Sequence, residues 1–308
     1  MVKFELTPKS ANAILNNHHL GDLSSIEEIK SGSINPVYLL NQKYILRFDL
    51  GNPEYKDKLK KESALYSILP QYSVPTPSLI AFDDSCTLSN YPYFIISYLS
   101  GQNLQDGFPL QSVDFKNTLS SELGNLLRSL HSIKQKDLNG IEMLGDINSW
   151  VDKVKKNFVI YLSHIKDNNY FSADVITQIE TVFADYQKIS NWEIVASLTH
   201  GDINPGNIKM DNGHLTGIFD FEYACIADPF IDFERFPLNY LLGDTFNQQL
   251  FLQSYGLTNF SDEQKTRLKT YCLSQGMWEI WATATQQFPY GQEVIIEGKL
   301  LVTKTINL

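Results

Sequence analysis

The chain has 308 residues, of which 43% are hydrophobic and 19% are charged, and its formal net charge is -10 at pH 7. This composition is typical of a globular protein with a sizeable core and excludes a disordered or collagen-like chain. The sequence has neither a basic stripe nor a run of about 18 apolar residues, so we expect no nucleic-acid partner and no membrane span.

The charge is unevenly distributed along the chain. Residues 1–103 hold 9 Lys and Arg against 10 Asp and Glu, whereas residues 104–308 hold 16 against 25. An acidic second half could attract a cationic small molecule, or it could serve solubility alone. The first residues lack an apolar signal core, and the three cysteines include no CxxC pair. We therefore expect reduced thiols and a cytoplasmic protein.

The first hundred residues predict a sheet with one prominent helix. Strand-like runs lie at residues 25–30, 37–40, 44–48, 78–82 and 93–98. The helix is expected over residues 55–69, where apolar residues recur at helical spacing after Pro53. Beyond a Ser-Gly boundary, helical periodicity dominates at residues 112–133, 150–165, 175–189 and 263–287. The sequence thus predicts a small sheet-rich lobe over residues 1–99, a hinge at about 97–103 and a larger, mainly helical lobe over residues 100–308.

Most of the candidate catalytic and metal-binding residues lie in the stretch 198–232, LTHGDINPGNIKMDNGHLTGIFDFEYACIADPFID. Asp202 lies early in a Gly- and Pro-containing loop that Asn207 closes, and Asp220 ends an apolar run. A hairpin turn is expected at Asn212, because Asn-Gly readily adopts the positive φ angles that such a turn needs. The strand returning from this turn should bring Asp220 alongside Asn207, so that an amide and a carboxylate converge.

Phosphoryl transfer requires such a set of groups. Two groups chelate Mg²⁺ on the nucleotide phosphates, one carboxylate orients the attacking hydroxyl, and a cation holds the phosphates that do not react. An isolated Asp and Asn at this spacing would be ordinary loop residues. It is their combination with the hairpin, with Asp220 and with a separate sheet-rich lobe that favours this chemistry.

The segments HGDINPGN and GIFDFEYACIADPFID resemble the HGDxxxxN and IDxxxxxxxDPxxD pattern of the aminoglycoside phosphotransferase and choline kinase family. The resemblance covers nearly the whole chain. It implies an α+β, protein-kinase-like bilobal fold, with a small antiparallel-sheet N-lobe carrying one helix and a larger, mainly helical C-lobe. It also implies that Asp202 is the catalytic base, that Asn207 and Asp220 are magnesium ligands, and that His200 and Asp232 are structural residues of the catalytic loop.

In the first lobe, the family holds the α and β phosphates with a basic residue on the third strand, paired with a helix glutamate. YILRFDL places Arg47 at that position, where many relatives have Lys, and KKESALYSIL offers Glu62 as its partner. An Arg guanidinium can bind phosphate, with a reach and geometry different from those of a Lys ammonium group. Each residue could alternatively be an ordinary surface residue of its strand or helix.

Two further segments of the first lobe are expected to contact the nucleotide. The phosphate-covering loop falls on Ser31, Gly32 and Ser33, whose small size permits close backbone approach, although a plain hairpin turn explains them nearly as well. YFIISYLSGQNL resembles the hinge, where backbone groups near Ser97, Tyr98 and Leu99 would bond the adenine edge.

The leading hypothesis is therefore an ATP-dependent kinase that uses Mg²⁺ and acts on a hydroxyl of a small molecule, with GTP as the alternative donor. The acceptor is either an aminoglycoside or a metabolite such as choline, ethanolamine, homoserine or a sugar. Residues that could contact a cationic acceptor are Glu222, Asp228, Glu234 and Glu279. A nucleotide-binding pseudokinase is a weaker alternative, because the base and both metal positions are present.

Overall fold

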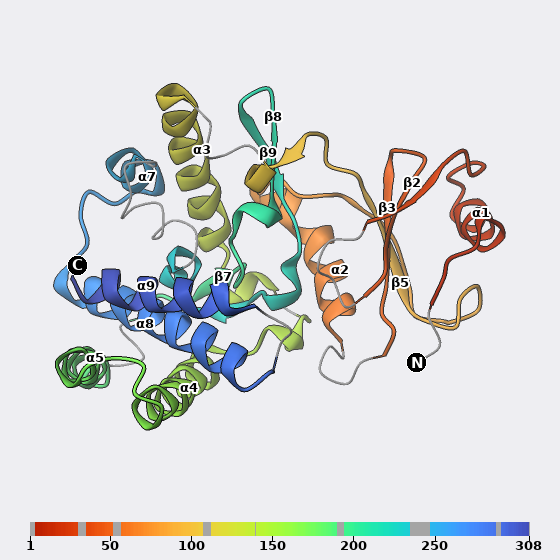
Figure 1. Cartoon of the computed structure of the whole chain (residues 1–308). Coiled ribbons are helices and arrows are strands. Elements are labelled where there is room, and N and C mark those ends of the chain that lie inside the picture. Colours follow the sequence, from red (N-terminus) through yellow and green to blue (C-terminus); the bar gives the residue numbers. More distant parts are fainter. Residues whose placement is uncertain are drawn as a thin grey trace. The chain divides into compact units, whose positions relative to one another are not determined.

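The computed structural model describes residues 4–29, 35–51, 57–106, 112–138, 140–189, 194–234, 247–287 and 291–307. Within these ranges the chain forms two compact units (Figure 1). The first consists of Met1–Leu104 together with Asn207–Tyr223, and the second of Gln105–Gly206 together with Ala224–Leu308. The chain therefore enters each unit twice.

Strand pairing explains why the chain returns to the first unit. β6 (Gln102–Asn103) pairs antiparallel with β8 (Ile208–Asp211), and β9 (His214–Ile218) completes a three-stranded sheet. The predicted division at residues 99 and 100 placed this hairpin in the second lobe, whereas the structure groups residues 207–223 with the first unit. The pairing with β6 joins segments more than a hundred positions apart, which local sequence patterns do not reveal.

A five-stranded antiparallel sheet forms the body of the first unit, in the order β1-β2-β3-β5-β4. Its strands are β1 (Ile26–Glu28), β2 (Val37–Leu40), β3 (Tyr44–Phe48), β4 (Leu79–Asp83) and β5 (Tyr93–Ser97). The sequence predicted all five. Because side chains alternate along a strand, Leu46 and Phe48 face one side of β3 and Arg47 faces the other.

α1 (Pro8–Asn17) covers the Leu46 and Phe48 face of this sheet (Figure 1). The helix begins after Thr7, whose side chain accepts a hydrogen bond from the Ser10 N–H, and Pro8 occupies its first turn. Its Ala11, Ile14 and Leu15 are buried against the sheet. Sequence analysis predicted a single helix in this lobe and therefore missed α1, although its start signal is present in the sequence.

α2 (Lys58–Ile68) lies on the opposite face of the sheet, where the ring of Tyr66 packs 6.0 Å from that of Phe94 on β5 (Figure 1). In the described residues the helix begins at Lys58, after Asp57, which adopts a left-handed conformation with φ 65°. The expected start at Pro53 lies outside the described residues.

The predicted hairpin is confirmed between β8 and β9. Asp211 pairs with His214, and the two turn residues Asn212 and Gly213 have φ angles of 49° and 83°. Positive φ at both turn positions is the geometry expected of a two-residue hairpin loop with the sequence Asn-Gly. The register shifts by one residue between Lys209 and Met210, after which Ile208 lies opposite Ile218 at the other end of the hairpin.

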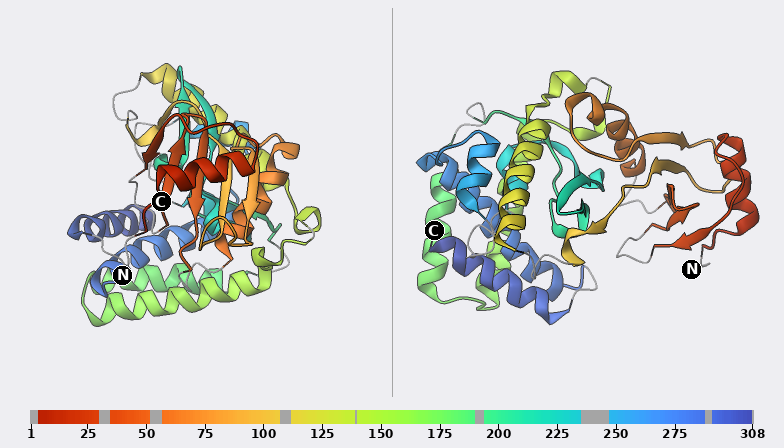
Figure 2. Two further views of the ribbon diagram at one scale, coloured as in Figure 1. Left: turned by 90° about the vertical axis from the view of Figure 1, so that its right-hand side faces the viewer. Right: turned by 90° about the horizontal axis from the view of Figure 1, so that it is seen from above.

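Helices build the second unit around α8, which has twelve buried residues. They are α3 (Val113–Ser132), α4 (Ile147–Asp167), α5 (Ala173–Tyr186), α7 (Gln248–Tyr255), α8 (Asp262–Ala284) and α9 (Gln292–Ile306). α9 runs alongside α8 (Figures 1 and 2). A Cβ on Gly276 would lie 2.7 Å from the carbonyl oxygen of Gly298, so the glycines permit this close approach. None of the described helices could cross a membrane.

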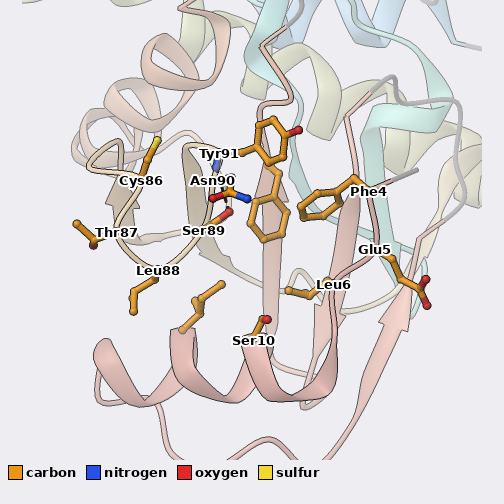
Figure 3. A pocket seen from close by; sticks show the side chains of 12 residues that line it. Phe4, Glu5, Leu6, Ser10, Cys86, Thr87, Leu88, Ser89, Asn90 and Tyr91 are labelled. Atoms are coloured by element: carbon orange, nitrogen blue, oxygen red, sulfur yellow. Dashed lines mark hydrogen bonds between the residues drawn. The ribbon is translucent and has the colours of Figure 1, made fainter. Parts of the chain in front are cut away.

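The first unit also contains a pocket of about 400 Å³ on the side of the sheet that α1 covers (Figure 3). Phe4 and Glu5, two residues of α1 and the loop 86–91 line it. Of the residues that line this pocket in the described part of the chain, none belongs to the predicted site.

Candidate active site

The structure joins Arg47 and Glu62 in a buried ion pair. Arg47 points from β3 toward α2 and is 8% exposed, so it is not an ordinary surface residue of its strand. Its Nη1 donates to Glu62 Oε2 at 2.9 Å and to Asp220 Oδ1 at 3.0 Å, and its Nη2 donates to Glu222 Oε2. One guanidinium thus organises three carboxylates, of which sequence analysis had paired only Glu62 with it.

Glu62 in turn connects α2 to the segment that carries Asp220. Its Oε1 accepts hydrogen bonds from the Tyr66 hydroxyl at 2.7 Å and from the Phe221 N–H at 3.3 Å. The Tyr66 hydroxyl accepts from the Asp220 N–H at 3.0 Å. Sequence analysis missed Tyr66; its signal is the spacing of four residues from Glu62, which places both side chains on one face of α2.

Burial and the neighbouring charges shift the pKa values of this pair. Burial raises the pKa of Glu62 to about 7, against the opposing effect of the Arg47 charge. Burial alone would lower the pKa of Arg47, but Glu62, Asp220 and Glu222 together raise it above its ordinary value. Arg47 therefore remains a cation, and Glu62 binds a proton more tightly than an isolated glutamate does.

Asn207 and Asp220 lie at the same end of the β8–β9 hairpin. The Asn207 carbonyl accepts a hydrogen bond from the Phe219 N–H at 3.1 Å, and Asp220 follows immediately. Asp220 has φ 70°, and its side chain is 34% exposed. The hairpin therefore brings the backbone of Asn207 beside Phe219, directly before the partly exposed carboxylate of Asp220.

These residues fit a magnesium–phosphate group. The described part of the chain holds no cluster of three or more His, Cys, Asp or Glu side chains able to bind a metal alone. Mg²⁺ commonly binds through one or two carboxylates and completes its shell with water and substrate phosphates. The Nε of Arg47 is buried and has no hydrogen-bond partner among the described residues, so the guanidinium retains a donor for a further acceptor.

The predicted catalytic loop follows β7 (Ser197–Thr199), which pairs with β10 (Cys225–Ala227) in the second unit. Asp232 braces this loop through two backbone contacts. Its Oδ2 accepts from the His200 N–H at 2.8 Å, and its Oδ1 accepts from the Gly201 N–H at 2.7 Å. The geometry suits the structural roles expected of His200 and Asp232, and it holds the backbone directly before Asp202.

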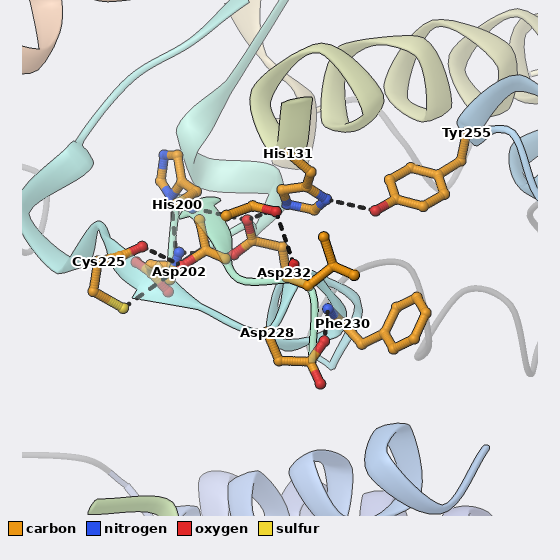
Figure 4. Close-up of polar contacts among 12 residues, drawn as sticks. His131, His200, Asp202, Cys225, Asp228, Phe230, Asp232 and Tyr255 are labelled. Atoms are coloured by element: carbon orange, nitrogen blue, oxygen red, sulfur yellow. Dashed lines mark hydrogen bonds and ion pairs between the residues drawn. The ribbon is translucent and has the colours of Figure 1, made fainter. Parts of the chain in front are cut away.

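His131, at the end of α3, connects Asp232 to α7 (Figure 4). Its Nε2 lies 3.0 Å from Asp232 Oδ2, and its Nδ1 lies 2.9 Å from the Tyr255 hydroxyl. Because a carboxylate only accepts, Nε2 carries the proton, and in the neutral ring Nδ1 accepts from Tyr255. Sequence analysis did not assign His131 to the site, since a single His at a helix end carries little signal.

Asp228 does not serve as a contact for an acceptor, contrary to the expectation. It is fully buried, and its Oδ2 accepts from Arg267 Nη1 at 2.9 Å and from the Tyr271 hydroxyl at 2.7 Å. Its Oδ1 accepts from the Phe230 N–H at 3.0 Å. Asp228 therefore fastens the turn before Asp232 to α8.

The other residues proposed for the acceptor are divided between the two units. Glu222 belongs to the first unit, where it binds Arg47 and Lys58. Glu234 and Glu279 belong to the second unit; Glu234 is 9% exposed, and Glu279 accepts from Gln275 Nε2 at 2.9 Å. The acceptor contacts proposed for Glu222, Glu234 and Glu279 stay a prediction.

The structure limits which backbone N–H groups of the predicted hinge could contact adenine. The Ser97 N–H donates to the Ser78 carbonyl at 2.9 Å, and the Tyr98 N–H donates to the Lys43 carbonyl at 2.8 Å. Both donors are thus already used within the sheet and are not free for adenine, which leaves Leu99 as the candidate donor. The predicted phosphate loop, Ser31, Gly32 and Ser33, lies outside the described residues.

Comparison with known proteins places this site in context. Residues 25–249 match the model of the phosphotransferase enzyme family. A probable aminoglycoside 3'-phosphotransferase from Lactococcus lactis subsp. lactis is 27% identical over 175 residues, which cover 52% of this chain and 64% of the relative. A homoserine kinase from Mesorhizobium japonicum is 24% identical over 231 residues, covering 69% and 63%. The chain thus matches just under two thirds of the length of these relatives.

Solved structures share the fold at lower identity. The GDP complex of wild-type aminoglycoside 2'-phosphotransferase-IIIa has a TM-score of 0.74 at 19% identity, covering 98% of this chain and 99% of that one. A macrolide 2'-phosphotransferase from Brachybacterium faecium has a TM-score of 0.65 at 15% identity, covering 96% and 98%. The predicted α+β, kinase-like fold is therefore confirmed.

Proposed function

Because the chain belongs to the phosphotransferase enzyme family, we propose that it transfers the γ-phosphoryl group of ATP to a hydroxyl of a small molecule. The observation that carries this proposal is the arrangement at the end of the β8–β9 hairpin. There Asp220 lies next to Asn207 and is bound by the buried Arg47. A metal-binding carboxylate beside a fixed cation is the pairing that nucleotide phosphates require.

Each residue has a distinct role in the proposed reaction. Asn207 and Asp220 hold Mg²⁺, which when bound offsets the negative charge of the phosphates. Arg47, held in position by Glu62, binds the phosphates that do not react. Asp202 orients the acceptor hydroxyl and takes up its proton as the oxygen attacks.

The proposal includes the nucleotide that donates the phosphoryl group and the cellular location of the protein. Solved relatives include complexes with GDP and a ternary complex with ATP and streptomycin. We favour ATP, with GTP as the alternative, and Leu99 is the candidate contact to the base. A cytoplasmic location would supply the nucleotide and keep the three free cysteines reduced.

For the acceptor we propose an aminoglycoside-like, cationic polyol. Residues 104–308 carry 25 Asp and Glu against 16 Lys and Arg, and one relative is named as an aminoglycoside phosphotransferase. An acidic surface raises the local concentration of a cationic substrate. Homoserine is the second candidate, because another relative of similar identity is named as a homoserine kinase. ADP release measured with a panel of both acceptor classes decides between them.

Asp202→Asn tests the mechanism. We expect phosphoryl transfer to fall by at least about a hundredfold, because general-base catalysis contributes on this scale. ADP affinity should change little, since Asp202 is not assigned to the nucleotide. Asp211→Asn is the matched control, because Asp211 is an exposed carboxylate in the hairpin turn. Loss of nucleotide binding in Asp202→Asn, or full activity, would contradict the assigned role.

A further inference from the structure

Two cations and three carboxylates are packed together in the first unit. Arg47 contacts all three carboxylates, and Lys58, the first residue of α2, lies 3.5 Å from Glu222. Sequence analysis assigned no role to Lys58. Its ammonium group also lies 3.9 Å from the ring centre of Tyr223, and its side chain is only 20% exposed. Lys58 is thus a second cation held beside Arg47.

Glu222 bridges these two cations with its two oxygens. Oε2 accepts from Arg47 Nη2, and Oε1 faces Lys58 Nζ. A bidentate anion between a guanidinium and an ammonium group is also the arrangement in which such cations bind phosphate. In this structure, therefore, the carboxylate of Glu222 occupies the position that an anionic ligand of Arg47 and Lys58 would take.

We propose that Glu222 is an internal anion that nucleotide phosphate must displace, and that Lys58 is a second phosphate-binding residue beside Arg47. This inference rests on the proposed function, since it assumes that Arg47 binds nucleotide. It assigns Glu222 to regulation of the nucleotide site rather than to the acceptor. Removing the negative charge of Glu222 weakens its contacts with both Arg47 and Lys58, so that phosphate can take its place. Removing Lys58 takes away one of the two groups that the phosphate would contact.

The charge balance of the cluster supports this assignment. When Glu62 is ionised, the carboxylates of Glu62, Asp220 and Glu222 outnumber the cations Arg47 and Lys58, so an incoming phosphate meets net repulsion until one carboxylate withdraws. Glu62 is fixed by Tyr66 and by the Phe221 backbone. Asp220 is needed for the metal. Displacement of the Glu222 carboxylate would expose Arg47 and Lys58 to the phosphate and leave the carboxylates of Glu62 and Asp220 in place.

Binding of ADP in EDTA, measured by calorimetry, isolates the phosphate contacts from the metal. Glu222→Gln is expected to tighten the dissociation constant about tenfold, and Lys58→Met to weaken it about tenfold, which is a moderate effect for one partly buried charge. Lys58→Arg should recover most of the affinity. Lys60→Met, which removes an exposed cation from the same helix, is the control and should leave the affinity unchanged.

A repeat of the measurement with Mg²⁺ separates this role from the main alternative. If Glu222 were a metal ligand, Glu222→Gln would leave ADP affinity unchanged in EDTA and weaken it with Mg²⁺, and the inference would be overturned. Unchanged affinity in Lys58→Met would overturn it too. If the unaltered protein bound neither ADP nor GDP under either condition, the proposed function would itself be wrong. Circular dichroism of each variant confirms that it is folded before binding is measured.

Discussion

An arginine at position 47 can do what a lysine there could not. Its Nη1 contacts Glu62 and Asp220, and its Nη2 contacts Glu222. A planar guanidinium with five donors can satisfy several carboxylates at fixed angles, whereas an ammonium group is a compact point charge. The geometry of the site therefore depends on the guanidinium, which contacts all three carboxylates.

Glu62 should make the stability of the protein depend on pH. Its pKa of about 7 lies above the ordinary 4.5, so the folded protein binds this proton more tightly than the unfolded chain does. The free energy of unfolding should therefore fall as the pH rises from 4.5 to 7. For this group the loss is up to roughly 3 kcal/mol. Glu62→Gln, which does not titrate, should lack this decline.

Urea denaturation of both proteins between pH 4.5 and 8 checks this expectation. The relevant quantity is the difference in unfolding free energy between wild type and Glu62→Gln, because other titrating groups cancel in it. As the pH rises, the wild type should lose unfolding free energy relative to Glu62→Gln, and the difference should level off above pH 7. Parallel curves would show that Glu62 ionises at its ordinary pKa in the folded protein.

The site residues on β3 and α2 are positioned by the regular spacing of side chains along a strand and a helix. On β3, Leu46 and Phe48 pack under α1, so Arg47 must face α2. On α2, Glu62 and Tyr66 are one turn apart and share the buried face. Both patterns are local, whereas the pairing of Arg47 with Glu62 was expected from the family resemblance.

α8 should owe part of its stability to the buried contact between Arg267 and Asp228. Breaking a buried ion pair by removing one partner typically costs about 3–5 kcal/mol, because the other charge stays buried. We therefore expect Arg267→Met to lower the melting temperature strongly. Lys265→Met removes an exposed cation from the same helix and should have almost no effect.

A double mutant distinguishes a direct contact from general damage to α8. In Arg267→Met/Asp228→Asn neither residue carries a charge, so the combined loss should be smaller than the two single losses added together. Calorimetric melting of the four proteins provides this comparison. Strict additivity would show that the two residues stabilise the fold independently.

At the scale of the whole molecule, short-range features were predictable and long-range ones were not. The stretch 198–232 was interpretable because the loop, the turn and the metal residues lie within a few positions of one another. The contact of Glu222 with Arg47 was not predicted, because nothing near Glu222 in sequence indicates Arg47, which lies 175 positions away. Likewise the burial of Asp228 depends on Arg267, 39 positions further on. Pairing of β6 with β8 was missed for the same reason.

Ligand binding offers a test that involves the whole folded chain. A ligand that binds only the folded state stabilises it by about 2.7 kcal/mol at a hundred times its dissociation constant. We expect ADP to raise the melting temperature, and Mg²⁺ to raise it further. Asp220→Asn should lose the part that depends on Mg²⁺ and keep the part that ADP provides alone.

The substitution is well suited to this measurement because Asp220 has φ 70°, a left-handed conformation that Asn tolerates readily. The backbone should therefore be preserved, and the change is confined to the charge. Asp211→Asn, at the other end of the hairpin, should retain both increments in melting temperature. If Asp220→Asn also kept the full Mg²⁺ increment, the metal would be held by residues other than the pair at the end of β8 and β9.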